Sequence, residues 1–130
     1  MPDEARMRIG LAGGLKVTAE FQGFTMWTDQ PVAVGGDGSA PAPFDLFLAS
    51  IGTCAGFFVA RFCQGRGIDT AGIALELTAQ HDEQSHLVTH IRLAIRLPAS
   101  FPARCQPAVV RAAELCTVKQ HLRAPPATAT

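Results

Sequence analysis

Four cysteines are the side chains in this sequence best suited to redox or nucleophilic chemistry: Cys54, Cys63, Cys105 and Cys116. A thiolate can attack an electrophilic oxygen or sulfur, and two neighbouring thiols can close into a disulfide. No two of the four have the CxxC or CxxxxC spacing from which structural zinc sites take ligands, so the sequence predicts no metal site. The first residues, MPDEARMRIG, hold acids and no apolar signal core, so we expect a cytoplasmic protein with reduced thiols.

Cys54 lies near the middle of a long apolar stretch, APAPFDLFLASIGTCAGFFVARFCQGRGI, at residues 40–68. The pattern predicts one helix that begins near Pro43, has Asp45 in its first turn and ends near the glycines at 65 and 67. Its uncharged run, residues 46–60, has 15 residues. A membrane-spanning helix needs about 20, so we expect a buried core helix.

The helix geometry separates two of the cysteines. Cys54 and Cys63 are nine residues apart, which at about 100° per residue places them on opposite faces. The helix face around Cys54 is apolar, and loss of hydration raises the pKa of a thiol unless another group compensates. From the residues alone, Cys54 is either a small core side chain or a nucleophile, and the same alternatives stay open for Cys116.

The rest of the chain predicts an α+β domain with an antiparallel sheet, spanning residues 1–130 as one domain. Three short strands are expected within residues 8–29, with breaks at 13–14 and 22–23, followed by a loop rich in Gly and Pro. Alternating apolar residues predict strands at 73–80 and 87–97, with Leu87, Thr89 and Ile91 on one face. A second helix is expected over 102–116, and a turn or short helix follows over 117–122.

Several functions are disfavoured by composition and motif. The net charge is +0, from 11 basic and 11 acidic residues, which gives no field to attract nucleic acid or an anionic membrane. The GGDG segment at 35–38 is not followed by the Lys-Ser/Thr of a phosphate-binding loop. His86 and His90 share a strand face without a third metal ligand nearby, so we interpret them as solvated surface residues.

The segment GGDGSAPAPFDLFLASIGTCAGFFVARFCQGRGI resembles the OsmC/Ohr family, the osmotically induced and organic hydroperoxide resistance proteins. That family has a glycine-rich loop, then Pro-x-x-Leu, then a helix with Gly-x-Cys near its centre. Its second mark is a late cysteine followed by a small residue and Val, matched here by Cys116-Thr117-Val118. The resemblance covers roughly residues 8–123, nearly the whole chain.

This resemblance implies a two-layer α+β fold, with a central cysteine-bearing helix and a second C-terminal helix, in an intertwined homodimer. It implies a bacterial thiol-dependent peroxidase that protects against oxidative stress by reducing organic hydroperoxides, with an external thiol reductant and no cofactor. Cys54 matches the peroxidatic cysteine and Cys116 the resolving one. Cys63 and Cys105 are then expected to be dispensable for peroxide reduction.

The sequence also departs from the pattern. The hydroperoxide-resistance branch has a Glu ten residues before the peroxidatic cysteine, paired with an Arg of the N-terminal sheet, whereas this chain has Phe44 there and an acid one residue later, Asp45. One residue turns a helical side chain by about 100°. Arg8 and Lys16 are the nearest candidate cations. The alternative function is a dimeric binding protein for a small hydrophobic ligand, with non-catalytic or redox-sensing cysteines.

Overall fold

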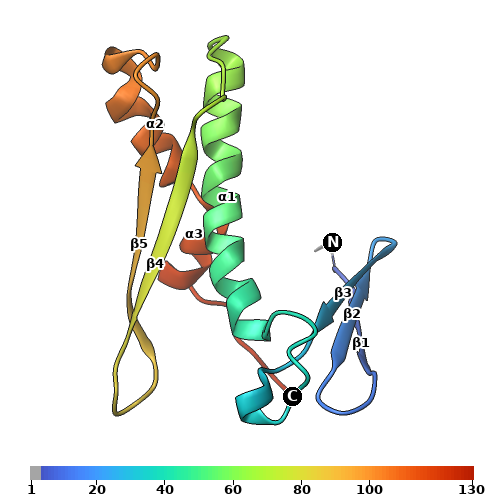
Figure 1. Cartoon of the computed structure of the whole chain (residues 1–130). Helices are drawn as coiled ribbons and strands as arrows, with labels where there is room; N and C mark the ends of the chain where they lie inside the picture. The colour runs from blue at the N-terminus through green and yellow to red at the C-terminus, as the bar shows by residue number, and fades with distance from the viewer. Residues whose placement is uncertain (1–3) are drawn as a thin grey trace. The chain divides into compact units, whose positions relative to one another are not determined.

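The computed structural model describes residues 4–130 and has the expected α+β architecture, with antiparallel strands and three α-helices (Figure 1). Its strands form two separate sheets, one of three strands and one of two. Contacts within the chain are concentrated in two compact units, which meet in sequence at Phe47 and Leu48. Each unit is described by itself.

The first unit is built on the three short strands that the sequence predicted: β1 (Arg8–Leu11), β2 (Val17–Phe21) and β3 (Phe24–Thr28). They pair in the order β1-β2-β3, and both pairings are antiparallel. The two turns lie at the predicted breaks and use left-handed backbone, with φ of 51° at Gln22 and 80° at Gly23 in the second. A left-handed turn matches the right-handed twist of a hairpin, which is why polar or glycine residues occupy it.

Asp29, at the end of this sheet, organises the loop before the long helix. Its side chain is 1% exposed, and its carboxylate accepts hydrogen bonds from the backbone N–H of Gln30 at 2.8 Å and of Ser39 at 3.0 Å. The Ser39 hydroxyl donates a further bond at 2.6 Å. Glycine is required at Gly36, where a Cβ would lie 2.0 Å from the Gln30 carbonyl oxygen. The GGDG segment therefore wraps around a carboxylate of its own chain.

The second unit contains most of α1 (Pro43–Gly65), which begins in the first unit, and all later elements. These are the hairpin β4 (Ala74–His81) and β5 (Val88–Arg96), the short 3-10 helix η2 (Ala103–Cys105), α2 (Gln106–Ala113) and α3 (Thr117–Arg123). The helix begins at Pro43, as expected, and the predicted second helix divides into η2 and α2.

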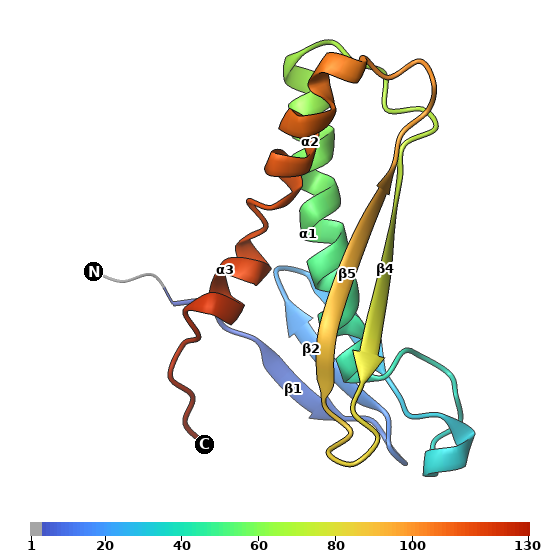
Figure 2. The same ribbon diagram turned by 90° about the vertical axis from the view of Figure 1, so that its left-hand side faces the viewer.

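A single core joins the layers of this unit. The buried stripe of α1 repeats every four residues, at Ile51, Ala55, Val59 and Cys63, the spacing that keeps side chains on one side of a helix. Helices α1 and α2 lie on one face of the β4–β5 hairpin (Figure 2). The core cluster adds Phe101, Val109, Ala113 and Cys116, and the hairpin packs against it with the alternating residues Ile73, Leu75, Leu93, Ile95 and Leu97.

The start of β5 differs from the expectation. Leu87 is 67% exposed and Thr89 is also exposed, so neither shares the inner face with Ile91. The register of the hairpin shifts between Gln80 and His81. Leu87 belongs to the turn, where its carbonyl accepts the Asp82 N–H at 2.8 Å. Side chains alternate between the two faces of a strand, so a shift of one residue in the register reverses the faces. Leu87 and Thr89 therefore do not share the inner face with Ile91.

Asp29 gives a prediction for the pH dependence of stability. The Ser39 hydroxyl, together with the backbone N–H groups of Ser39 and Gln30, holds the pKa of the Asp29 carboxyl well below its usual value. A depressed pKa in the folded state stabilises the fold above the unfolded pKa of about 3.9, and this stabilisation is lost as pH falls further. We expect Asp29→Asn to lower the melting temperature at pH 7 and to have less effect near pH 3. An equal loss at both pH values, measured by circular dichroism, would contradict this role.

Candidate active site: a thiol pair

Two of the four cysteines come together in the second unit. Cys54 lies half-buried on α1, and Cys116 is fully buried immediately before α3. The Cys116 thiol is within hydrogen-bonding reach of the Cys54 sulfur. Both thiols are free. The pair that the sequence singled out is therefore adjacent in space, and the enzymatic roles of its two members remain predictions.

The first turn of α3 determines the protonation of Cys54. Burial raises the pKa of the Cys54 thiol, but hydrogen bonds from the Val118 N–H, the Cys116 thiol, and the N–H and hydroxyl of Thr117 outweigh it. The net result is a pKa below the ordinary value for cysteine. Hydrogen bonds to the charged form of a group stabilise that form, so these donors stabilise the Cys54 thiolate relative to the neutral thiol. The hydrogen bonds, and not burial, therefore decide the direction in which the Cys54 pKa is shifted.

Cys116 occupies the residue that caps α3, with φ −45° and ψ 120°, which is not helical. Its S–H donates to the Ile51 carbonyl oxygen at 3.6 Å, and its side chain is 0% exposed. The single proton can go either to this carbonyl or to the Cys54 sulfur. An ionised Cys54 is the stronger acceptor, since charge-assisted hydrogen bonds are the stronger ones. The proton can thus follow the charge on Cys54.

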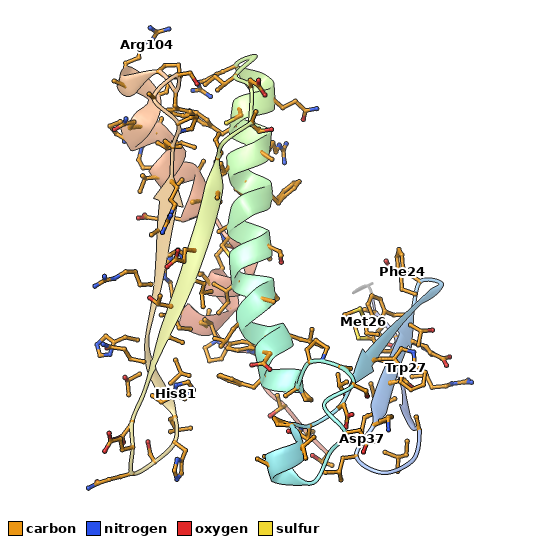
Figure 3. All side chains as sticks on the ribbon, viewed as in Figure 1. Phe24, Met26, Trp27, Asp37, His81 and Arg104 are labelled. Carbon is orange, nitrogen blue, oxygen red and sulfur yellow. The ribbon has the colours of Figure 1, made fainter. Side chains whose placement is uncertain are left out.

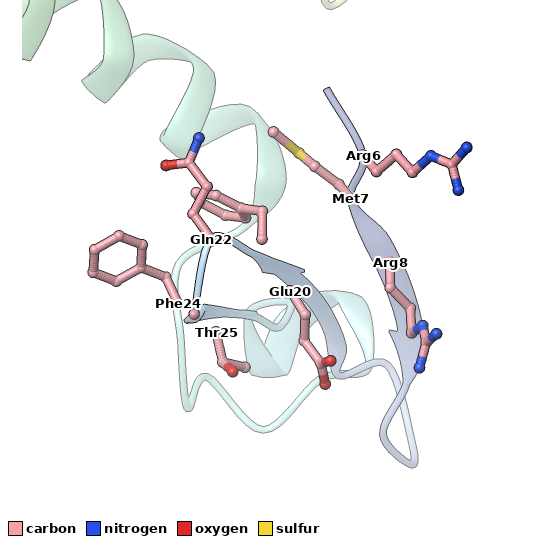
Figure 4. Close-up of a pocket in the computed structure, with 9 residues that line it drawn as sticks. Arg6, Met7, Arg8, Glu20, Gln22, Phe24 and Thr25 are labelled. Atoms are coloured by element: carbon pink, nitrogen blue, oxygen red, sulfur yellow. The ribbon is translucent and has the colours of Figure 1, made fainter. Parts of the chain in front are cut away.

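Polar residues of the first unit have other partners. Lys16 forms an ion pair with Asp37, a residue of the loop around Asp29. Arg8 lines a cavity of about 720 Å³ beside β1, together with Glu20 (Figure 4). Within residues 4–130, every group that lowers the Cys54 pKa belongs to Cys116, Thr117 or Val118, and neither candidate cation is among them.

The residues at the start of α1 also differ from an acid–cation pair. Phe44 is 47% exposed, and its ring lies 5.4 Å from that of Phe47. Asp45 is exposed in the first turn of α1. A negative charge at this end of a helix is stabilised by the positive end of the helix dipole. Within the described residues, no group of three or more His, Cys, Asp or Glu side chains is arranged to hold a metal ion.

Sequence reasoning missed the donors to Cys54. The motif at Cys116 includes Thr117 and Val118 but does not predict that they donate hydrogen bonds to Cys54. Every residue except proline has a backbone N–H, so the residue type cannot identify such a donor. Sequence reasoning also missed that Cys105 packs against the core cluster containing Cys63. A cavity of about 330 Å³ is lined by Ile51, whose carbonyl accepts from the Cys116 thiol, and by Ile91, Lys119, Leu122 and Arg123.

The model of the family described as "OsmC-like protein" matches residues 36–130, which include both Cys54 and Cys116. The chain belongs to the OsmC-like family. A search of curated proteins gave no match. Among solved structures, the chain is similar to an osmotic stress induced and detoxification response protein of Psychrobacter arcticus, with TM-score 0.78, 23% identity, and coverage of 92% of this chain and 89% of that chain.

Two further solved structures carry names from the hydroperoxide branch. An organic hydroperoxide resistance protein of Legionella pneumophila has TM-score 0.57 and 17% identity, covering 94% of this chain and 92% of that chain. The organic hydroperoxide resistance protein of Bacillus subtilis has TM-score 0.57 and 18% identity, with 92% of each chain covered. At these identities, the likeness establishes the OsmC-like fold and leaves the activity to be argued from the site.

The hydrogen bonds to Cys54 predict how this OsmC-like protein titrates. Thr117→Val removes one hydroxyl donor and keeps both backbone donors, so the pKa of Cys54 should rise but stay below that of the Thr117→Val/Cys116→Ala variant. The measurement is the pH profile of iodoacetamide alkylation at Cys54, followed by peptide mass spectrometry. The wild-type midpoint should lie below that of a free cysteine measured under the same conditions. An unchanged midpoint in both variants would contradict the assignment of the donors.

Proposed function

We propose that the chain is a cysteine-based peroxidase that reduces organic hydroperoxides, with Cys54 as the attacking thiol and Cys116 as the resolving one. The single observation that supports this most is the hydrogen bonding at the half-buried Cys54 sulfur, where the Cys116 thiol and the first residues of α3 are donors that lower the pKa of Cys54. A buried cysteine that only fills space has its pKa raised, since nothing compensates for lost hydration.

The proposed reaction has two steps. The Cys54 thiolate attacks one peroxide oxygen, the O–O bond breaks, and the other oxygen leaves as an alcohol after taking up a proton. Cys54 becomes a sulfenic acid, oxidised by two electrons. Cys116 then attacks this sulfur, an S–S bond forms, and the hydroxyl leaves as water. An external dithiol donates two electrons and two protons to restore both thiols.

The surroundings favour an organic substrate over hydrogen peroxide. The cavity at Ile51, the residue whose carbonyl accepts from Cys116, has three aliphatic residues in its lining, and Lys119 and Arg123 supply positive charge there. An apolar substituent gains by leaving water for such a surface. Activation of Cys54 would rest on hydrogen-bond donors of α3 in place of the acid–cation pair, so we expect a slower first step than in enzymes with both devices.

The second candidate function is a binding protein for a small hydrophobic ligand. The same aliphatic cavity supports it, and so does the complete burial of Cys116. Binding alone, however, gives no reason for four donor groups around the Cys54 sulfur. Peroxide consumption separates the two functions.

We also propose that the protein acts as a homodimer in the cytoplasm. The first sheet leaves large apolar side chains exposed: Ile9, Leu11, Phe24, Met26 and Trp27 (Figure 3). The helix α1 is long and apolar enough to cross a membrane by length and composition, and only 22% of its most apolar window is buried within the chain. Apolar surface of this extent is typical of an interface. A second copy would cover it without a membrane.

Cysteine variants test the enzymatic proposal. Cys54→Ser should abolish consumption of cumene hydroperoxide, because it removes the thiol whose pKa is lowered by the donors of α3. Cys116→Ser should react once and stop at a sulfenic acid that is open to overoxidation. Cys63→Ser is the matched control, a buried cysteine of the same helix, and should retain turnover. Stopped-flow peroxide loss and mass spectrometry of the oxidised protein give both readouts.

Two results would defeat this proposal. One is equal peroxide consumption by wild type and Cys54→Ser. The other is the absence of a Cys54–Cys116 disulfide after treatment with hydroperoxide. Together these results would leave the binding function. A fluorescent hydrophobic probe should then bind equally well to wild type and to Cys54→Ser.

The dimer has its own test. Wild type should sediment as a dimer at micromolar concentration, and Trp27→Glu should shift it toward monomer, because Trp27 is 52% exposed within one chain. Glu83→Gln, a change in the exposed β4–β5 turn, should leave the mass unchanged. A wild-type monomer in sedimentation velocity would contradict the proposal.

A further inference from the structure

The two remaining cysteines also lie near each other, in the part of the second unit where α1 ends and α2 begins. Cys63 is 0% exposed and belongs to the core cluster, and Cys105 is half-buried and packs against that cluster. Each thiol is free. Cys105 is the last residue of η2, and its N–H donates to the Pro102 carbonyl at 2.9 Å, so its backbone is held in place.

Cys105 lies at a cavity. A cavity of about 560 Å³ is lined by Cys105, by Ser100, and by the charged residues Arg66, Arg104 and Asp69. Arg66 is held flat, with its guanidinium 4.0 Å from the centroid of the Phe62 ring. Arg104 lies at the end of the hairpin and helices that Figure 3 draws uppermost. Asp69 offsets one of these charges, so the lining keeps an excess of one positive charge beside a thiol.

We propose that Cys63 and Cys105 form a second redox dithiol, in which the Cys105 thiolate reacts first with small disulfides that carry carboxylates. The proposal does not depend on the peroxidase function, because it uses neither Cys54 nor Cys116. The cavity selects the reagent by charge, since guanidinium groups pair with carboxylates in a fixed, two-pronged geometry. The buried partner supplies the second sulfur.

The chemistry is an exchange in two steps. The Cys105 thiolate attacks one sulfur of the small disulfide, an S–S bond to Cys105 forms, and one small thiolate leaves. Cys63 then loses its proton to solvent and attacks the Cys105 sulfur, which releases the second small thiolate and closes the Cys63–Cys105 bond. Two protein thiols are oxidised, and the small disulfide is reduced to two thiols.

Burial fixes the order of these steps. Burial, and the nearby Cys105, raise the pKa of the Cys63 thiol, so Cys63 is a poor nucleophile near neutral pH. The mixed disulfide at Cys105 should therefore accumulate first, and the internal bond should close faster as pH rises.

The experiment uses the full chain carrying Cys54→Ser and Cys116→Ser, treated with glutathione disulfide as the carboxylate probe and with cystamine as the cationic probe. Intact mass and peptide mapping should show one glutathionyl group on Cys105, followed by its loss as Cys63–Cys105 forms. Glutathione disulfide should react faster than cystamine by about fivefold, the factor that corresponds to one exposed ion pair. Arg104→Gln should narrow this ratio, and Cys63→Ala should make the mixed disulfide persist.

The same mapping on the wild-type chain guards against a misfolded variant, because peptides joined through Cys63 and Cys105 differ from those joined through Cys54 and Cys116. A first modification at Cys63, equal rates for the two probes, or no Cys63–Cys105 linkage in the folded wild type would each overturn the proposal. None of these results bears on peroxide consumption.

Discussion

The hydrogen bonds from the first turn of α3 to the Cys54 sulfur are the interaction that sets the ionisation of this thiol. A thiol on an apolar helix is driven toward its neutral form, and only local donors reverse this. The donors are available because α2 ends at Ala113 and the backbone at Cys116 leaves the helical region. A continuous helix through this segment would have used the same N–H groups in its own hydrogen bonds. The break between α2 and α3 therefore leaves these N–H groups free to donate to the Cys54 sulfur.

Two cysteines of one helix show how far surroundings alone can separate thiols. Cys54 and Cys63 both lie on α1, yet the pKa of the first is lowered and that of the second is raised. Burial acts in the same direction on both thiols. The difference is that α3 presents N–H and O–H donors to Cys54, whereas Cys63 lies in a cluster of apolar residues. The position of a cysteine along α1 determines which groups surround its sulfur, and these groups determine whether its pKa is raised or lowered.

The sequence was sufficient for features that depend on local pattern. The helix from Pro43, the glycine turns of the first sheet and the inner positions of β5 from Ile91 onward follow from spacing and residue type. Features that depend on backbone groups or distant residues were out of reach. The register shift that exposes Leu87 arises from hydrogen bonds of the turn, and Asp29 is buried because loop N–H groups gather on it. A sequence pattern reports which side chains are present. The positions of Leu87 and Asp29 depend instead on hydrogen bonds of the main chain.

The same limit bears on the departure at Phe44. The resemblance implies an acid at this position that pairs with a cation near the thiolate. Because this chain has Phe44 there, the sequence alone predicts that such a pair is missing. In the structure, the groups that lower the Cys54 pKa all lie within Cys116, Thr117 and Val118 among the described residues. These donors stand in the same unit as the thiol and require no charge from the first sheet. At the position of that acid this chain has Phe44, which presents apolar and largely exposed surface at the start of α1.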